Sequence, residues 1–203
     1  MYCTVKALTL LLESYKQRNQ GLTVKKEIKI LESRQIYRNR WMSLKEDRIL
    51  RANGSEGLYS VIEKDDFVVI IPVENDEIYL VEQYRYPLGQ RTTELPQGSW
   101  ECSRDAAPED VARGELKEET GLSAGKMEYV GYQKLAQGYS AQGYHIYLAT
   151  ELTFTGQLEE EEYGLTVKKI KISAFAQLIR DGKITDATSV TAFLLARTKN
   201  MFS

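Results

Sequence analysis

Short apolar runs separated by turn residues dominate the pattern along the chain. The strongest runs are 67–72 and 78–83, and the polar residues 74–77 lie between them, which predicts a β-hairpin. Weaker alternation predicts further strands at 26–31, 41–50, 58–62, 127–134, 144–152 and 165–172. Two helices are expected at 173–180 and 185–198, and we assign them a scaffold role without chemistry of their own.

The strands within residues 26–62, with a Gly-containing turn at 52–57, predict a small antiparallel sheet whose apolar side needs a partner surface. Residues 1–25 form an N-terminal extension in which the apolar run 7–12 is too short to span a membrane. An accessory helix and a poorly ordered segment are both open for this extension. The main domain is expected to occupy residues 63–203.

Residues 108–121 have the pattern of a helix that packs against a core. Pro108 suits a first turn, and Gly121 suits a C-terminal cap. Ala112 and Leu116 stand four residues apart and form an apolar stripe. This stripe fixes which side of the helix is buried.

Three glutamates crowd the second half of this helix. Glu115 and Glu119 share one face, one turn apart, and Glu118 lies beside them. Like charges at this spacing repel, and a hard divalent cation would offset the cost. Taken alone, such a triplet is more often a solvated surface. The apolar stripe, however, lies only about 60° away on the helical wheel, so the acids border the buried side.

Two further features lie upstream of this helix. A tight turn at 95–98 could present a backbone carbonyl beside the acids, so Gln97 joins the candidate metal ligands. Arg85 directly follows a buried strand, where a planar guanidinium suits bidentate recognition of phosphate. An ordinary surface arginine at a strand end is an equally open interpretation of Arg85.

Composition narrows the classes of protein that these features fit. The chain has 203 residues, 42% hydrophobic and 28% charged, which predicts a soluble globular protein of one domain or one domain with an appendage. A net charge of −2 gives no reason to expect nucleic-acid binding. The two cysteines are far apart and suggest a reducing, cytoplasmic location. The one histidine, His145, lies in an apolar run and is expected to be a sheet residue.

The segment 94–122 resembles the Nudix box, the loop-helix signature of the Nudix hydrolases. Gly98 matches its opening glycine, and residues 115–122 (ELKEETGL) match its second half. The sequence departs from the pattern at Gly114, where the family has arginine, and at Arg104, where it has glutamate; the intervening loop is also longer. Both departures affect bracing of the loop, and Arg113 is a candidate to take over part of that role.

The residues 80–87 (LVEQYRYP) and 94–98 (ELPQG) narrow the resemblance to the ADP-ribose pyrophosphatase branch, over about 36–195. It implies a mixed α/β (α+β) fold: an α/β/α Nudix sandwich with a mixed sheet, plus an N-terminal sheet that swaps across a homodimer. It also implies Mg²⁺-dependent hydrolysis of a nucleoside diphosphate sugar, with Mn²⁺ as an alternative metal. ADP-ribose is the leading substrate, and AMP and ribose 5-phosphate are the products. Neither nucleic acid nor a membrane is expected as a partner.

The resemblance implies roles for individual residues. Glu115 and Glu119 would hold the metal, with Glu118 bound directly or through water, and Glu119 would be essential for turnover. Arg85 would bind the diphosphate, and Glu94 would line the site or help to hold the metal.

Other implied roles fall on loops. Trp41 would stack on the nucleobase, in its own or the partner's site, although an ordinary packing role is equally open. Ser140 belongs to a substrate loop in which Gln142 stands where the family often has an acid. In the acidic run 159–162, which as a bare pattern suits a solvated loop, Glu162 is the first choice for the catalytic base and Glu161 the second.

Two alternatives stay open. GDP-mannose or another nucleotide sugar would keep the chemistry and change the substrate. A non-catalytic nucleotide sensor is a different class of protein, which Gly114 and Arg104 favour and the intact glutamates argue against.

Overall fold

The computed structural model describes residues 27–99, 106–156 and 164–202. The predictions for the extension 1–25 and for Arg104, Glu161 and Glu162 lie outside these residues. The described chain forms two compact units, one made of 27–36 and 45–61 and the other of 37–44 and 62–202. No helix in the described part of the chain is long and apolar enough to cross a membrane.

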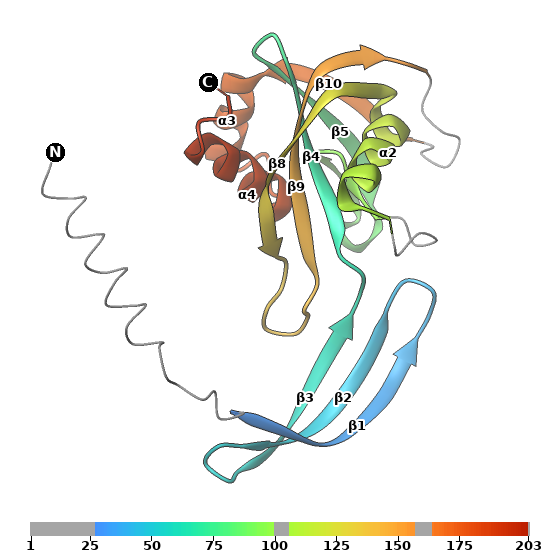
Figure 1. Ribbon diagram of the computed structural model, residues 1–203, viewed down its shortest axis with the longest axis vertical. Helices are drawn as coiled ribbons and strands as arrows, with labels where there is room; N and C mark the ends of the chain where they lie inside the picture. Colours follow the sequence, from blue (N-terminus) through green and yellow to red (C-terminus); the bar gives the residue numbers. More distant parts are fainter. Residues whose placement is uncertain (1–26, 100–105, 157–163, 203) are drawn as a thin grey trace, which may run out of the picture. The chain divides into compact units, whose positions relative to one another are not determined.

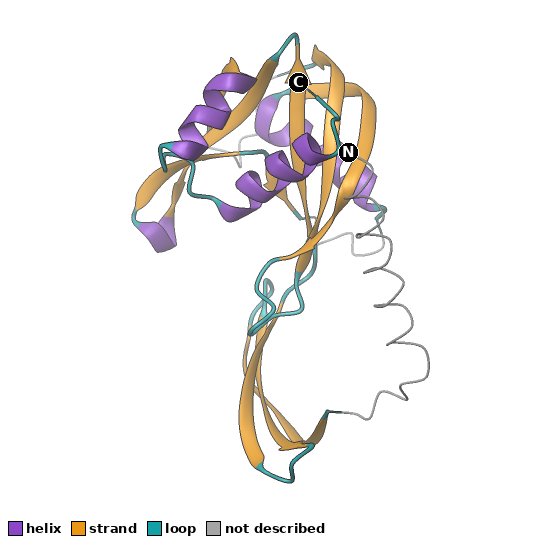
Figure 2. Ribbon diagram, turned by 90° about the vertical axis from the view of Figure 1, so that its left-hand side faces the viewer, coloured by secondary structure: helices purple, strands orange, loops and turns teal. Residues whose placement is uncertain are grey.

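The N-terminal strands form a three-stranded antiparallel sheet in chain order: β1 (Ile28–Arg38), β2 (Ser43–Arg51) and β3 (Glu56–Glu63). Figure 2 shows strands and loops alone across these residues. Strand β1 extends beyond the predicted 26–31. The sequence does not indicate its second half, because nearly all positions of the strand are exposed and apolar alternation is weak there.

The prediction that Trp41 begins a strand is wrong. Trp41 lies in the turn between β1 and β2, where the side-chain oxygen of Asn39 accepts hydrogen bonds from the backbone N–H groups of Trp41 (2.9 Å) and Met42 (2.8 Å). An asparagine that bonds its own backbone in this way favours a turn over a strand.

The second unit contains a mixed sheet, as predicted, with strand order β10-β5-β4-β9-β8. The strands are β4 (Phe67–Glu74), β5 (Glu77–Arg85), β8 (Leu122–Lys134), β9 (Gly143–Phe154) and β10 (Thr166–Lys171). Strands β4 and β9 are parallel, and the other neighbours are antiparallel. His145 lies in β9, as expected of a sheet residue.

Helices cover both faces of this sheet: α2 (Pro108–Thr120) on one side, and α3 (Ile172–Arg180) with α4 (Ala187–Thr198) on the other (Figure 1). Alternate residues of β4 serve the two layers. Val68 and Ile70 pack in the core that includes the apolar stripe of α2, whereas Val69 and Ile71 pack in the core beneath α3 and α4. Because both faces are buried, this strand is a continuous apolar run and not an alternating one.

The β4–β5 hairpin opens soon after its turn, which makes room for the segment that follows the short strand β6 (Gln90–Glu94). Pairing between β4 and β5 is confined to their turn ends, and β6 extends the sheet beside β5. The freed edge of β4 pairs instead with β7 (Gln97–Gly98), and the Ile70 N–H donates to the Pro96 carbonyl at 2.9 Å. The predicted tight turn at 95–98 is therefore wrong: this segment is extended and lies alongside β4.

Candidate active site

Helix α2 is held in one orientation by signals that its sequence contains. Pro108 occupies the first turn, and Gly121 ends the helix with a φ of 70° and donates to the Lys117 carbonyl. The side chains of Ala112 and Leu116 are fully buried against β4. This packing determines where the acidic side chains of the same helix lie.

The clustered glutamates do not form a solvated face. Glu115 and Glu119 are buried, with 8% and 4% of their surfaces exposed, and Glu118 is half-buried. Arg113 connects the helix to the sheet. Its guanidinium donates to the Ala124 carbonyl of β8 at 2.9 Å and to Glu109 within the helix. Arg113 thus braces α2 against the sheet.

Both buried carboxylates contact strand β7. Glu119 Oε2 accepts a hydrogen bond from the Gln97 N–H at 2.9 Å. Glu115 packs against Gly98 so closely that a Cβ at that position would lie 2.2 Å from Glu115 Oε2. The insertion of β7 beside β4 therefore brings the loop and the acidic helix together, and the glycine permits their close approach.

These residues fit a divalent cation of the hard class. Within residues 27–99, 106–156 and 164–202, no group of three or more acidic, histidine or cysteine side chains forms a complete metal site. Mg²⁺ does not require one, because it is commonly bound by one or two carboxylates together with waters and substrate phosphates. Two buried carboxylates that face one strand supply such a donor set. The assignment of Glu118 and Gln97 as ligands stays a prediction.

A cavity of about 480 Å³ lies beside strand β7, the strand that Glu115 and Glu119 contact. Gln97 and Gly98 contribute to its wall, and so does Arg85. Its apolar lining includes Phe67, Leu88 and Leu135. A cavity of this size, with the basic side chains of Lys64 and Arg85 in its wall and apolar side chains elsewhere, suits a small phosphorylated molecule.

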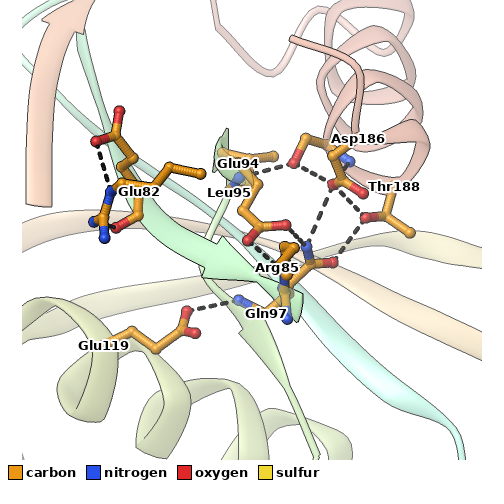
Figure 3. A network of polar contacts seen from close by, with 10 residues as sticks. Glu82, Arg85, Glu94, Leu95, Gln97, Glu119, Asp186 and Thr188 are labelled. Atoms are coloured by element: carbon orange, nitrogen blue, oxygen red, sulfur yellow. Dashed lines mark hydrogen bonds and ion pairs between the residues drawn. The ribbon is translucent and has the colours of Figure 1, made fainter. Parts of the chain in front are cut away.

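Arg85 is held by a buried carboxylate. Its Nε donates to Glu94 Oε1 at 2.9 Å, and the second oxygen of Glu94 accepts from the side-chain amide of Gln97 at 2.8 Å (Figure 3). Glu94 is 2% exposed, and burial raises the pKa of its carboxyl group, although the hydrogen bond from Arg85 opposes the shift. Glu94 is part of the cavity wall, and its role in lining the site or holding the metal stays a prediction.

The first turn of α4 completes this part of the wall, and we did not predict it from sequence. Asp186 caps the helix: its Oδ2 accepts from the Ser189 N–H at 2.8 Å and from the Ser189 hydroxyl at 2.6 Å. Asp186 and Thr188 both line the cavity. Aspartate is a preferred N-cap residue, so Asp186 is consistent with a helix start, but it carries no information about which cavity that start faces.

Two predicted substrate-binding residues are not among the described residues that line the cavity, Trp41 and Ser140. Trp41 is 51% exposed with the Arg40 guanidinium 4.2 Å above its ring, so it is not a core packing residue. Ser140 is buried, and its hydroxyl accepts from the Gln142 N–H at 3.1 Å. Gln142 does line the cavity, and its amide donates to the Asp65 carbonyl at 2.7 Å.

Comparison with known proteins gives consistent matches to both units. Residues 28–62 match the nucleoside diphosphate sugar hydrolase N-terminal domain, and residues 64–188 match the NUDIX domain. A crystal structure of an ADP compounds hydrolase superposes with a TM-score of 0.76 at 21% identity, covering 85% of this chain and 94% of that one. The expected Nudix fold, with a mixed sheet and a small N-terminal antiparallel sheet, is thereby confirmed.

Curated relatives match over most of their length. The methanol dehydrogenase activator of Bacillus methanolicus is 29% identical over 170 residues, covering 82% of this chain and 90% of the relative. The ADP-ribose pyrophosphatase of Mycobacterium tuberculosis is 28% identical over 171 residues, covering 83% and 82%. The ADP-ribose pyrophosphatase of Bacillus subtilis is 26% identical over 170 residues, covering 82% and 90%.

Proposed function

The chain belongs to the Nudix hydrolase family, and we propose that it hydrolyses the diphosphate bond of a nucleoside diphosphate sugar, with ADP-ribose the leading substrate and AMP and ribose 5-phosphate the products. One observation carries the proposal. Two buried glutamates, Glu115 and Glu119, contact one side of the short strand β7, whose residues also line a cavity that contains Arg85. The two relatives named ADP-ribose pyrophosphatase support the choice of substrate.

We assign the metal to the carboxylates of α2. Glu115 and Glu119 would hold Mg²⁺, or Mn²⁺ in its place, with Glu118 bound directly or through water. A divalent cation held there supplies neutralisation of the diphosphate charge and activation of the attacking water. Gln97 is retained as a further ligand, through its backbone carbonyl. Burial of the two carboxylates supports this assignment, because a bound cation would offset the cost of placing like charges together away from water.

We assign the diphosphate to Arg85. Because Glu94 accepts from Nε, the plane of the guanidinium is fixed. Within the described part of the chain no hydrogen bond is made by its two terminal nitrogens, which suit a bidentate contact with phosphate. The same charge would stabilise the transition state as the bridging oxygen departs. Glu162, or failing it Glu161, would accept the proton of the attacking water, and Ser140 is retained as a residue of the substrate loop.

We also infer a homodimer that uses the N-terminal sheet. Ile28, Ile30 and Ile36 lie on one face of β1 by strand alternation and are 44%, 55% and 46% exposed, and Leu58 of β3 is 64% exposed. Apolar side chains exposed in this number on a three-stranded sheet need a partner surface. A second copy of the chain would supply one, and Trp41 would then stack on the base in its own or the partner's site. A cytoplasmic location rests on the two widely separated cysteines alone.

A panel of substrates tests this function. The protein is incubated with ADP-ribose, GDP-mannose and other nucleotide sugars, with Mg²⁺, with Mn²⁺ and with a chelator. We expect metal-dependent release of a nucleoside monophosphate, with the highest kcat/KM for ADP-ribose. A higher kcat/KM for GDP-mannose would move the assignment to that substrate. Tight binding without turnover would favour the sensor, the alternative that Gly114 keeps open.

A further inference from the structure

The first turn of α4 is connected to the cavity arginine by a chain of side-chain hydrogen bonds. Thr188 Oγ1 lies 2.7 Å from Gln97 Oε1, and Gln97 Nε2 lies 2.8 Å from Glu94 Oε2 and 3.3 Å from Asp186 Oδ2. Glu94 Oε1 in turn accepts from Arg85 Nε at 2.9 Å. Figure 3 shows Gln97 between the α4 residues and the Arg85–Glu94 pair.

We propose that Thr188 and Asp186 are positioning residues for substrate binding, which act on Arg85 through Gln97 and Glu94. The inference rests on the proposed role of Arg85 in holding the diphosphate. The first turn of α4, which has no part in the proposed reaction, would thereby have a role in substrate binding.

The orientation of the Gln97 amide is the central element. An ionised carboxylate can only accept hydrogen bonds, so the amide must turn its NH₂ group toward Glu94 and Asp186. Its oxygen then needs a donor, and the Thr188 hydroxyl is 2.7 Å away. Asp186 Oδ2 lies 2.5 Å from the same hydroxyl, so the single proton of Thr188 is shared between Gln97 and Asp186 and links the amide to the cap of α4.

Loss of the hydroxyl would act on Arg85 from a distance. Without a donor the amide oxygen is left unpaired beside a helix end, or the amide turns over and directs its oxygen at Glu94. The second change releases one oxygen of Glu94, a carboxylate that is held at both of its oxygens, and the first removes the contact that keeps the amide from turning. Arg85 would then lose the fixed plane in which it meets a diphosphate. The α2 carboxylate Glu119 contacts only the backbone of Gln97 and not its side-chain amide, so the effect should fall on binding more than on the chemical step.

Two variants of Thr188 form the test. Thr188→Val keeps the shape and removes the hydroxyl, whereas Thr188→Ser keeps the hydroxyl and serves as the matched control. KM and kcat are measured with ADP-ribose and Mg²⁺, and the Kd for ADP-ribose is measured by calorimetry in chelator, where no turnover is needed. We expect Thr188→Val to raise KM and Kd about tenfold, since a hydrogen-bond network to a charged group is weakened. We expect the kcat of Thr188→Val to stay within about twofold of the wild type, because a loss of uniform binding raises KM and leaves kcat unchanged. Thr188→Ser should restore KM and Kd to wild-type values.

A double-mutant cycle tests the route. In the Arg85→Ala background, Thr188→Val should change kcat/KM less than about twofold, because residues that act through one another are not additive. An unchanged KM and Kd in Thr188→Val, a full tenfold effect in the Arg85→Ala background, or a Thr188→Ser variant as weak as Thr188→Val would each overturn the proposal. If Thr188→Val melts more than about 5 °C below the wild type, Thr188→Ala replaces it in the same comparison.

The proposed function can fail separately. A wild-type protein that binds ADP-ribose but hydrolyses no nucleotide sugar would refute the enzymatic role, while the Kd comparison in chelator would still decide whether Thr188 positions Arg85. A Kd that does not respond to Arg85→Ala would refute the role of that arginine, and this inference with it.

Discussion

Replacing Gly98 by alanine should damage the active site while leaving the fold intact. A Cβ at this position would lie 2.2 Å from Glu115 Oε2 and 2.5 Å from its Cδ, whereas ordinary contact begins at 3.4 Å. The Oε2 atom must therefore move away by about 1.2 Å, the difference between the contact distance of 3.4 Å and the 2.2 Å found here. The φ of Gly98 lies outside the left-handed region, so alanine fits the backbone there, and the atom that must move is the end of a flexible side chain.

A displacement near 1 Å in a group that positions a reacting centre costs roughly 100-fold in rate. We therefore expect kcat/KM of Gly98→Ala for ADP-ribose with Mg²⁺ to fall by about that factor. Its melting temperature should stay within about 4 °C of the wild type, which corresponds to about 1 kcal/mol. Gly156→Ala is the matched control, since a Cβ there meets nothing within 4 Å and its φ is also outside the left-handed region. Wild-type activity in a well-folded Gly98→Ala protein would refute the argument that the position of Glu115 matters.

Three further predictions concern other parts of the molecule. Glu119→Gln should lose most turnover and keep its melting temperature, because the amide oxygen can still accept the backbone hydrogen bond; unchanged turnover would remove Glu119 from the mechanism. Hydrogen bonds from Lys168 and then Arg91 lower the pKa of Glu82 below its ordinary value of 4.5, so its stabilisation is present above pH 4.5 and is lost as the pH falls through the folded-state pKa. Glu82→Gln should therefore have a lower melting temperature than the wild type at pH 7, and the difference should disappear under acid conditions. A difference in melting temperature that is independent of pH would contradict this. Trp41→Ala should raise KM roughly tenfold if the ring stacks on the base, and an unaltered KM would leave this ring without a role in binding.

The parts of the fold that follow from sequence are those with strong local signals. Strand β4 is apolar from Phe67 to Val73 because helices cover both its faces, and α2 begins at a proline and ends at a glycine that adopts a φ of 70°. The same helix shows why its acids are buried: the stripe formed by Ala112 and Leu116 points into the core, and Glu115 and Glu119 border it. These features depend on neighbours along the chain, which periodicity detects.

The parts that sequence did not reveal depend on contacts between distant segments. Strand β7 has two residues, too few for any periodicity, and it exists because the β4–β5 hairpin opens. The role of Thr188 in the cavity wall depends on a contact with Gln97, 91 positions away. The alternating run 41–50 predicts that Trp41 lies in a strand. The side chain of Asn39 instead holds the backbone of Trp41 in a turn. The first two outcomes are decided by tertiary pairing, for which one sequence carries little signal, whereas the Asn39 turn is a local feature that hydrophobic alternation does not detect.

The most direct test of the central claim is the identity of the products formed from ADP-ribose. ³¹P NMR of the reaction follows the diphosphate signals of the substrate and the monoester signals of AMP and ribose 5-phosphate. We predict that, in Mg²⁺, the two monoesters appear in equal amounts as the diphosphate disappears, and that neither forms in chelator or with Glu119→Gln. A folded wild-type protein that leaves the diphosphate signals unchanged in Mg²⁺ and in Mn²⁺ would contradict the proposed reaction.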